Sequence, residues 1–551
     1  MDVGELLRFN PDKPDLKRKT TNDETSVESK LKRSTGEVTG NELTEEEREK
    51  ILRMVEQEPD GPAMDEADLR QLILRFEKKV YKNQEMRIKY PDQPEKFMTS
   101  EVDLNDAIQE MHVIATNPNL YHYLVDLNAV KSLLGLISHG NTDISIAVID
   151  LLQELTDVDT LNESEEAAEA LVDALLEDQI VATLVQNLDR LDDNLKEESE
   201  AIHNTLGIIE NMTEFRPEMC VDAGQQGLMQ WLLKRLKSKL AFDANKLYCS
   251  EILAILLQDT PENRELLGEV NGIDSLLQRL AGFKRHDPTT TEEIEMMENL
   301  FNCMCSALML PSNRGRFLKG EGVQLMNLML REKKLSRFSA LKVLDHAMTG
   351  DEGAENCNKF VEILGLRSVF PLFMKTHKKH KKGGISEDDH EEHVSSIIAS
   401  MLKHCTAANK LRVINKFVEN DHAKVDRLME LHFKYLTRVQ NVDDRIEKEK
   451  QARLQGGDII DDDQEDEYYL RRLDAGLFTL QLIDYIMLEL SCSSGVSTIK
   501  QRILQLLNMH KGSITAVRNV VREYAGNIGD AKSKEHGDAE RQRLLELVNR
   551  F

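Results

Sequence analysis

The sequence is short of aromatic residues and of proline. Phe, Trp and Tyr make up 5% of the 551 residues, with one tryptophan, Trp231, and the chain has only 12 prolines. Because proline interrupts helices, its scarcity permits long helical stretches. Apolar residues still form 40% of the chain, and Leu, Ile, Val, Ala and 21 Met supply most of them. This composition favours a large core built by packing helix on helix.

Long apolar runs are also missing. No stretch approaches the roughly 18 apolar residues of a membrane-spanning helix, and the first residues, MDVGELLRFN, lack the apolar core of a secretory signal. The seven cysteines are odd in number and form no CxxC pair, and most of them lie inside apolar helical patterns. We therefore expect reduced, buried thiols in the cytosol or nucleus and no association with a membrane.

Catalytic and ligand motifs are not found either. His390 and His393 are three residues apart without a nearby third ligand, and Gly320-Glu321-Gly322 lacks the third glycine of a dinucleotide loop. We expect no enzyme activity, no cofactor and no metal. The formal net charge of −27 repels phosphate backbones, so direct nucleic-acid binding is disfavoured as the main role. Basic protein segments are the natural electrostatic partners.

Residues 1–62 are polar and charged, and we expect them to form a disordered tail. Two basic clusters, eleven residues apart, resemble a bipartite nuclear import signal that an importin would read. The alternative is a solvated run of charge. The clusters consist of Lys17, Arg18, Lys30, Lys32 and Arg33.

A helical repeat begins after the tail. A short apolar helix at 129–137 and a polar turn precede a longer helix whose apolar residues recur on one face: Ile144, Ala147, Val148, Leu151, Leu152 and Leu155. Similar units start near residues 226, 271, 321 and 364, so the period is roughly 43–50 residues, close to that of armadillo and HEAT repeats. A glycine such as Gly272 stands at each helix joint, where we expect a positive φ.

The sequence therefore predicts an all-α, armadillo/HEAT-like α-solenoid that forms a right-handed superhelix. A basic run at 378–382 is expected to be a solvated loop, with RNA contact as the alternative. The C-terminal region would cap the last repeat or provide a surface for a homodimer. The expected parts are the tail at 1–62, an N-terminal helical cap or HEAT-like repeat at 63–126, armadillo-type repeats at 127–405, and a C-terminal helical region at 406–551 with a flexible acidic loop at 456–467.

Several strings resemble the beta-catenin-like family of nuclear armadillo proteins. The resemblance covers nearly the whole chain and is weakest between about residues 12 and 62. It implies a nuclear scaffold of the spliceosome-associated nineteen complex that supports pre-mRNA splicing. Implied partners are the cell-division-cycle-five-like splicing factor, bound through basic segments, other nineteen complex members and, in vertebrates, activation-induced cytidine deaminase. The strings are YKNQEMRIK (81–89), DLND (103–106), FLKGEG (317–322), LKVLDHAM (341–348), KVDRLMELHFKY (424–435) and LRRLDAG (470–476).

Armadillo proteins bind extended peptides on the face lined by the last helix of each repeat. Importin-type members use repeated Trp/Asn pairs there, but Trp231 lies on an earlier, shorter helix and Asn211 is the only asparagine at the expected place. Because this sequence departs from the Trp/Asn pattern, an importin-like carrier of basic cargo is the second hypothesis, after the splicing scaffold. Acidic residues would carry the binding instead, unless they form an ordinary solvated face. The candidates are Glu154, Asp157, Asp159, Glu210, Asn211, Glu214, Asp259 and Asp345.

Overall fold

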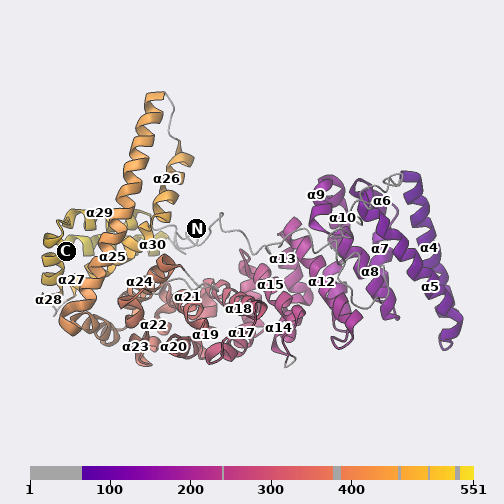
Figure 1. The fold of residues 1–551 in the computed structure, drawn as a ribbon, viewed down its shortest axis with the longest axis horizontal. Coiled ribbons are helices and arrows are strands. Elements are labelled where there is room, and N and C mark those ends of the chain that lie inside the picture. Colours follow the sequence, from indigo (N-terminus) through magenta and orange to yellow (C-terminus); the bar gives the residue numbers. More distant parts are fainter. Residues whose placement is uncertain (1–64, 239–240, 377–385, 457–460, 494–496, 528–533) are drawn as a thin grey trace, which may run out of the picture.

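The protein is an all-helical solenoid, and the predicted fold class is confirmed (Figure 1). In the computed structural model, the described residues contain helices and no strand. The tail with its basic clusters and the basic run at 378–382 lie outside the described part of the chain. That part comprises residues 65–238, 241–376, 386–456, 461–493, 497–527 and 534–551.

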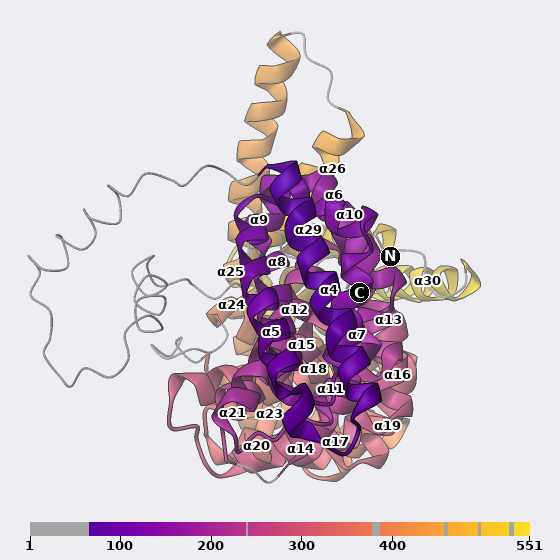
Figure 2. The same ribbon diagram turned by 90° about the vertical axis from the view of Figure 1, so that its right-hand side faces the viewer.

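The repeats place their helices in three rows. Figure 1 shows the second row (α14, α17, α20, α23) along the lower, outer edge of the curved molecule, with the third row above it, and Figure 2 looks along the stack. The first row comprises α6 (Tyr121–Asp126), α10 (Glu165–Glu177), α13 (Met219–Ala223), α16 (Pro261–Glu269), α19 (Pro311–Lys319) and α22 (Ala354–Glu362). The second comprises α7 (Ala129–Ile137), α11 (Ile180–Leu188), α14 (Met229–Lys237), α17 (Gly272–Leu280), α20 (Gly322–Glu332) and α23 (Leu366–Met374). The third comprises α8 (Thr142–Leu155), α12 (Lys196–Phe215), α15 (Ala244–Leu257), α18 (Thr291–Met309), α21 (Ser336–Met348) and α24 (Glu387–His404).

Polar residues in the turns start the long third-row helices. The Asn141 side chain accepts from the Asp143 amide at the start of α8, and Asp243 accepts from the Lys246 amide at the start of α15. Each cap satisfies a backbone N–H that the first helical turn leaves without a partner. Pro261 and Pro311 stand in the first turns of α16 and α19, where the missing N–H costs no hydrogen bond.

The joints between first-row and second-row helices differ from the expectation. The residue before the glycine adopts the positive φ, which is 58° at Asn271 and 61° at Glu321. The φ angles of Gly272 and Gly322 themselves are not positive. A Cβ on Gly272 would lie 2.4 Å from the Leu267 side chain, and one on Gly322 would lie 2.3 Å from the ring of Phe317. These glycines are needed because the two helices approach closely. Gly227, at 99°, follows the expectation.

Buried asparagines connect consecutive repeats. The amide of Asn263 donates to the Cys220 oxygen in the preceding repeat (2.7 Å) and to the Leu256 oxygen at the end of α15 (2.8 Å). Asn313 and Asn356 occupy the equivalent place in α19 and α22 and bond in the same way. Each asparagine thus ties its own helix to two backbone oxygens of the preceding repeat, and so fixes the register of the two repeats.

Further helices close both ends of the stack. At the N-terminal end, α4 (Glu66–Lys89) packs on α5 (Pro94–Met111), which packs on α8. At the other end, α27 packs on α24 and continues the third row, so the hydrophobic core runs unbroken from Leu69 to Phe551. The C-terminal helices are α25 (Ala407–Gly456), α26 (Asp462–Asp474), α27 (Leu477–Cys492), α28 (Ser497–Met509), α29 (Ile514–Gly526) and α30 (Lys534–Arg550). Short helices complete the chain: η1 (His112–Thr116), η2 (Pro118–Leu120), α9 (Val158–Glu163), η3 (Gly224–Leu228), η4 (Ala281–Lys284) and η5 (Asp351–Gly353).

Residues 462–467 of the acidic run, which we expected to be part of a flexible loop at 456–467, are helical, so this part of the expectation was wrong; residues 457–460 lie outside the described residues. Asp461 caps α26 by accepting from the Gln464 amide, and Asp462, Asp463 and Glu465 occupy its first turn. Negative side chains stabilise the positive end of the helix dipole there. Figure 1 shows α26 beside the outer half of α25, with both helices projecting from the body. Salt bridges such as Lys450–Glu465 join the two helices.

No single helix among the described residues has the length and apolar character of a membrane span; α26 and α27 meet that test only together, as a pair bent by 65°.

Candidate functional site

The candidate residues lie on or beside the third-row helices, which contact one another in sequence from α5 to α27. At least one polar side-chain bond crosses every step of this row from α5 to α27. These bonds fix the spacing of the helices and engage many of the polar groups on this face. The bonded pairs are Glu101–Asn141, Asp150–Asn204, Ser199–Asn245, Ser250–Asn299, Glu298–Ser339, Asp345–Ser396 and Glu392–Thr479.

Three candidate carboxylates gather where α8 ends and α9 begins. Glu154 is half exposed, and its Oε2 lies 2.7 Å from Nδ1 of His112. Asp157 caps α9 by accepting from the amides of Asp159 and Thr160, while Asp159 is exposed in the first turn. Burial and then the charge of Asp157 raise the pKa of the nearby Tyr121 phenol. Of this group, Asp159 presents its carboxylate most freely to solvent.

The second group lies near the end of α12. Glu210 accepts a hydrogen bond from the Tyr248 hydroxyl of α15, so its carboxylate is partly engaged inside the protein. Asn211 is half buried, and Glu214, one turn after Glu210, is exposed. The structure therefore brings these three residues onto one helix, with Glu214 at the surface.

The last two candidates lie apart from each other. Asp259 is exposed directly after α15, where its φ is 39°. Asp345, in contrast, is buried, so we correct its assignment to an open groove. Its Oδ2 lies 2.8 Å from Nδ1 of His393, and its Oδ1 accepts from the Ser396 hydroxyl. Asp345 thus holds α21 against α24 and does not face a partner.

The tryptophan and asparagine positions argue against an importin-type clamp. Trp231 is 7% exposed on α14, in the second row, so its ring fills the core and does not flank a bound lysine. Asn245 and Asn299 do lie on the third row, but both are buried and bond to serines of the preceding helix. Neither can grip a peptide backbone while these bonds are intact.

The paired histidines have separate partners. His390 Nε2 lies 3.1 Å from the Leu372 oxygen, and His393 bonds to Asp345. In the described ranges, no group of three or more His, Cys, Asp or Glu side chains is arranged to hold a metal ion.

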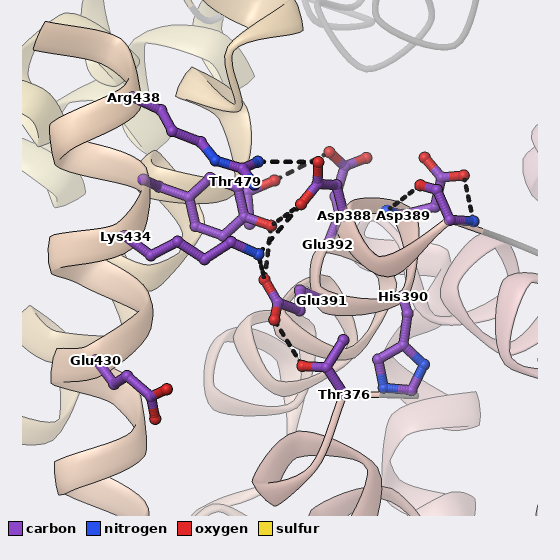
Figure 3. Close-up of polar contacts among 12 residues, drawn as sticks. Thr376, Asp388, Asp389, His390, Glu391, Glu392, Glu430, Lys434, Arg438 and Thr479 are labelled. Carbon is purple, nitrogen blue, oxygen red and sulfur yellow. Dashed lines mark hydrogen bonds and ion pairs between the residues drawn. The ribbon is translucent and has the colours of Figure 1, made fainter. Parts of the chain in front are cut away.

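A charged cluster that the sequence analysis missed joins α24 to α25 (Figure 3). Glu391, almost fully buried, accepts from Lys434 Nζ at 2.6 Å and from the Tyr435 hydroxyl at 2.7 Å. Its other oxygen accepts from Thr376 (2.6 Å) and Arg427 (3.1 Å). We call this set of five residues the α24–α25 clamp.

Asp388 extends the clamp towards solvent by accepting from Arg438 Nη1 at 2.9 Å and from Lys434 at 3.2 Å (Figure 3). Burial by itself would raise the pKa of Glu391, but hydrogen bonds from Lys434, Thr376 and Tyr435 outweigh it, so the pKa is lowered. The Glu391 carboxylate is thus ionised near neutral pH. A sequence signal existed, because Arg427, Lys434 and Arg438 recur at offsets of seven and four along one helix face.

Comparisons with known proteins agree with this architecture. The sequence pattern of a family described as catenin-beta-like, Arm-motif containing and nuclear matches residues 49–522. Beta-catenin-like protein 1 of Bos taurus is 66% identical over 488 residues, which cover 89% of this chain and 86% of that protein. The Homo sapiens protein of the same name is 65% identical over the same shares. A beta-catenin-like protein 1 homolog from Schizosaccharomyces pombe is 31% identical over 465 residues, covering 84% of this chain and 79% of that protein. The chain therefore belongs to the catenin-beta-like family of nuclear, Arm-motif proteins.

Proposed function

We propose that this protein is a non-enzymatic nuclear scaffold that binds basic segments of splicing factors on the third-row face of its solenoid. The observation that supports this most directly is the set of exposed carboxylates along that face: Asp159 beside α8, Glu214 on α12 and Asp259 after α15. A series of negative charges along an extended surface attracts Lys and Arg segments, and the net charge of −27 adds to the long-range field.

The partners that we propose are those that the family resemblance implies, and the negative net charge is compatible with basic partners. The proposed complex is the spliceosome-associated nineteen complex, in which the cell-division-cycle-five-like factor offers import-signal-like basic segments. Activation-induced cytidine deaminase is a further proposed partner in vertebrate relatives. The basic clusters at 17–33 would bind an importin and bring the protein to the nucleus, and the C-terminal helices would provide a surface for a homodimer.

Charge reversal at the exposed carboxylates tests the binding face. Asp159→Lys, Glu214→Lys and Asp259→Lys should together weaken binding of a lysine-rich import-signal peptide about tenfold or more, because each replacement removes an attraction and adds a repulsion. The measurement is a titration of a fluorescent peptide at two salt concentrations. Binding to the unaltered protein should weaken as salt rises.

A matched control makes the same change in net charge on a different surface of the solenoid. Glu269, Glu332 and Glu362 are exposed on α16, α20 and α22, outside the third row. Their reversal to lysine should leave peptide affinity within about threefold, the remaining effect being long-range and screened. Equal losses of peptide affinity in both triple variants would show that the peptide does not bind at the three carboxylates of the third-row face. Tight binding of many unrelated import signals, without stable co-purification of splicing proteins, would instead favour the carrier hypothesis.

A further inference from the structure

The first described helix carries an apolar stripe on its outer side. Leu74, Tyr81 and Ile88 on α4 are 57%, 73% and 81% exposed, although the opposite side of the helix is packed into the core. The three residues are spaced by seven and therefore lie along one line of the helix. Leu74 and Tyr81 also line a shallow groove together with Glu77, Lys78, Lys82 and Glu85. An end helix of a repeat stack ordinarily presents a polar outer face, so this stripe requires a cover.

The sequence immediately before α4 contains a matching stretch. Residues 44–58 read TEEEREKILRMVEQE, with Thr44 and Glu47 in the spacing of a capping box and Ile51, Leu52 and Val55 on one helical face. The family pattern already matches from residue 49, ahead of α4. The stretch therefore has the composition of a short amphipathic helix and lies partly within the region shared by the family.

The connection between this stretch and α4 limits where it can reach. Residues 59–64, PDGPAM, are rich in turn formers and have the length of an ordinary helix–helix connection. A return helix of residues 44–58 would extend about 22 Å. Antiparallel to α4, it would place Ile51 near Leu74 and Thr44 near Tyr81, but it would end before Ile88.

Charge supports the same pairing. Lys78 is exposed between Leu74 and Tyr81, and its ammonium group makes no ion pair with the described residues. In the antiparallel arrangement Glu47 falls opposite Lys78, in a stretch that is otherwise rich in glutamate. Opposite charges at the edge of a helix pair favour one register.

We propose that residues 44–58 fold back antiparallel to α4, cover Leu74 and Tyr81, and form the terminal layer of the solenoid. The chain before residue 44, with the basic clusters at 17–33, then leaves the body from this end. The expected disordered tail is correspondingly shorter than 62 residues.

Hydrogen exchange of the full chain tests the proposal. Amides of residues 44–58 should be protected in the unaltered protein, and the double variant Leu74→Asp/Tyr81→Asp should exchange there about tenfold faster or more. Ile88→Asp is the matched control: it adds the same kind of charge to the same helix, beyond the reach of the stretch, and should leave that exchange unchanged. Because Leu74 and Tyr81 contribute little to the core, circular dichroism should remain that of the folded solenoid.

A second variant tests the other side of the contact. Ile51→Asp/Val55→Asp should release the stretch to the same extent without altering α4 itself. Lack of protection at 44–58 in the unaltered protein would overturn the proposal. So would protection that disappears on dilution, which would identify a second copy as the occupant, or protection that persists in both double variants.

Discussion

The side-chain amide of Asn313 donates to the backbone oxygen of Arg264, 2.8 Å away in the preceding repeat, and to that of Ala307 at 3.0 Å. Arg264 and Ala307 belong to different helices, so one side chain ties α19 both to α16 and to the end of α18. Asn313 is completely buried, so these bonds lie out of contact with bulk solvent.

Asn313→Ala should therefore destabilise the protein by about 1–3 kcal/mol, because two backbone oxygens lose a donor inside the core. The measurement is the shift of the urea unfolding midpoint followed by circular dichroism. Asn441, exposed on α25, provides the control, and Asn441→Ala should change stability by less than about 0.5 kcal/mol. If the two variants unfold at the same urea concentration, Asn313 does not hold the repeats together.

His404 at the end of α24 makes stability depend on pH. Burial, with a smaller contribution from the Lys403 charge, lowers the pKa of His404 from 6.5 to about 4, even though Asp351 lies 3.3 Å away. Between pH 6.5 and pH 4 the unfolded chain therefore binds a proton that the folded chain does not. Stability falls as the pH falls through this range, by about 3 kcal/mol from this group.

Comparison of unfolding midpoints at pH 7 and pH 4.5 checks this effect. His404→Gln should lose less stability between the two pH values than the unaltered protein does. His286 is exposed on the loop before α18. His286→Gln should therefore lose as much stability between pH 7 and pH 4.5 as the unaltered protein does. An unchanged difference between the two pH values in His404→Gln would show that this histidine is protonated equally in both states.

The α24–α25 clamp yields a prediction about the C-terminal region. Glu391→Ala leaves Arg427 and Lys434 without their shared acceptor in a mostly buried place, and should cost about 2–4 kcal/mol. Glu430 is a suitable control, because it also pairs with Arg427 but is largely exposed. Glu430→Ala should cost less than about 1 kcal/mol. Thermal unfolding of both variants gives the measurement, and equal shifts would contradict the role of burial.

The helical repeat was predictable because its apolar periodicity is local. The residues from Ile144 to Leu155 mark a helix by their spacing alone, and the period of about 43–50 residues indicates stacking. The role of Gly272 was not predictable in the same way. Its closeness to Leu267 depends on the angle between two helices, and the positive φ falls on Asn271, a residue type that also tolerates that conformation.

The candidate site was less accessible to sequence reasoning. Asp345 and Glu214 are both carboxylates near the ends of third-row helices, but only contact with α24 distinguishes the buried one from the exposed one. The bond from His393 to Asp345 spans 48 residues of sequence. The contacts of Glu391 in the α24–α25 clamp span 15 to 44 residues of sequence, so the clamp becomes visible only once the helices are placed in space.

The asparagine bonds have a mechanical consequence. Each of them registers one repeat against its immediate neighbour only, so a slight rotation at one joint leaves all the others intact. Small rotations of the same sense add up along the stack, and the separation between α4 and α27 can change while every joint stays closed. The solenoid would therefore bend elastically along its length. A ligand that binds at two distant points would have to change the curvature of the solenoid in order to alter the distance between them.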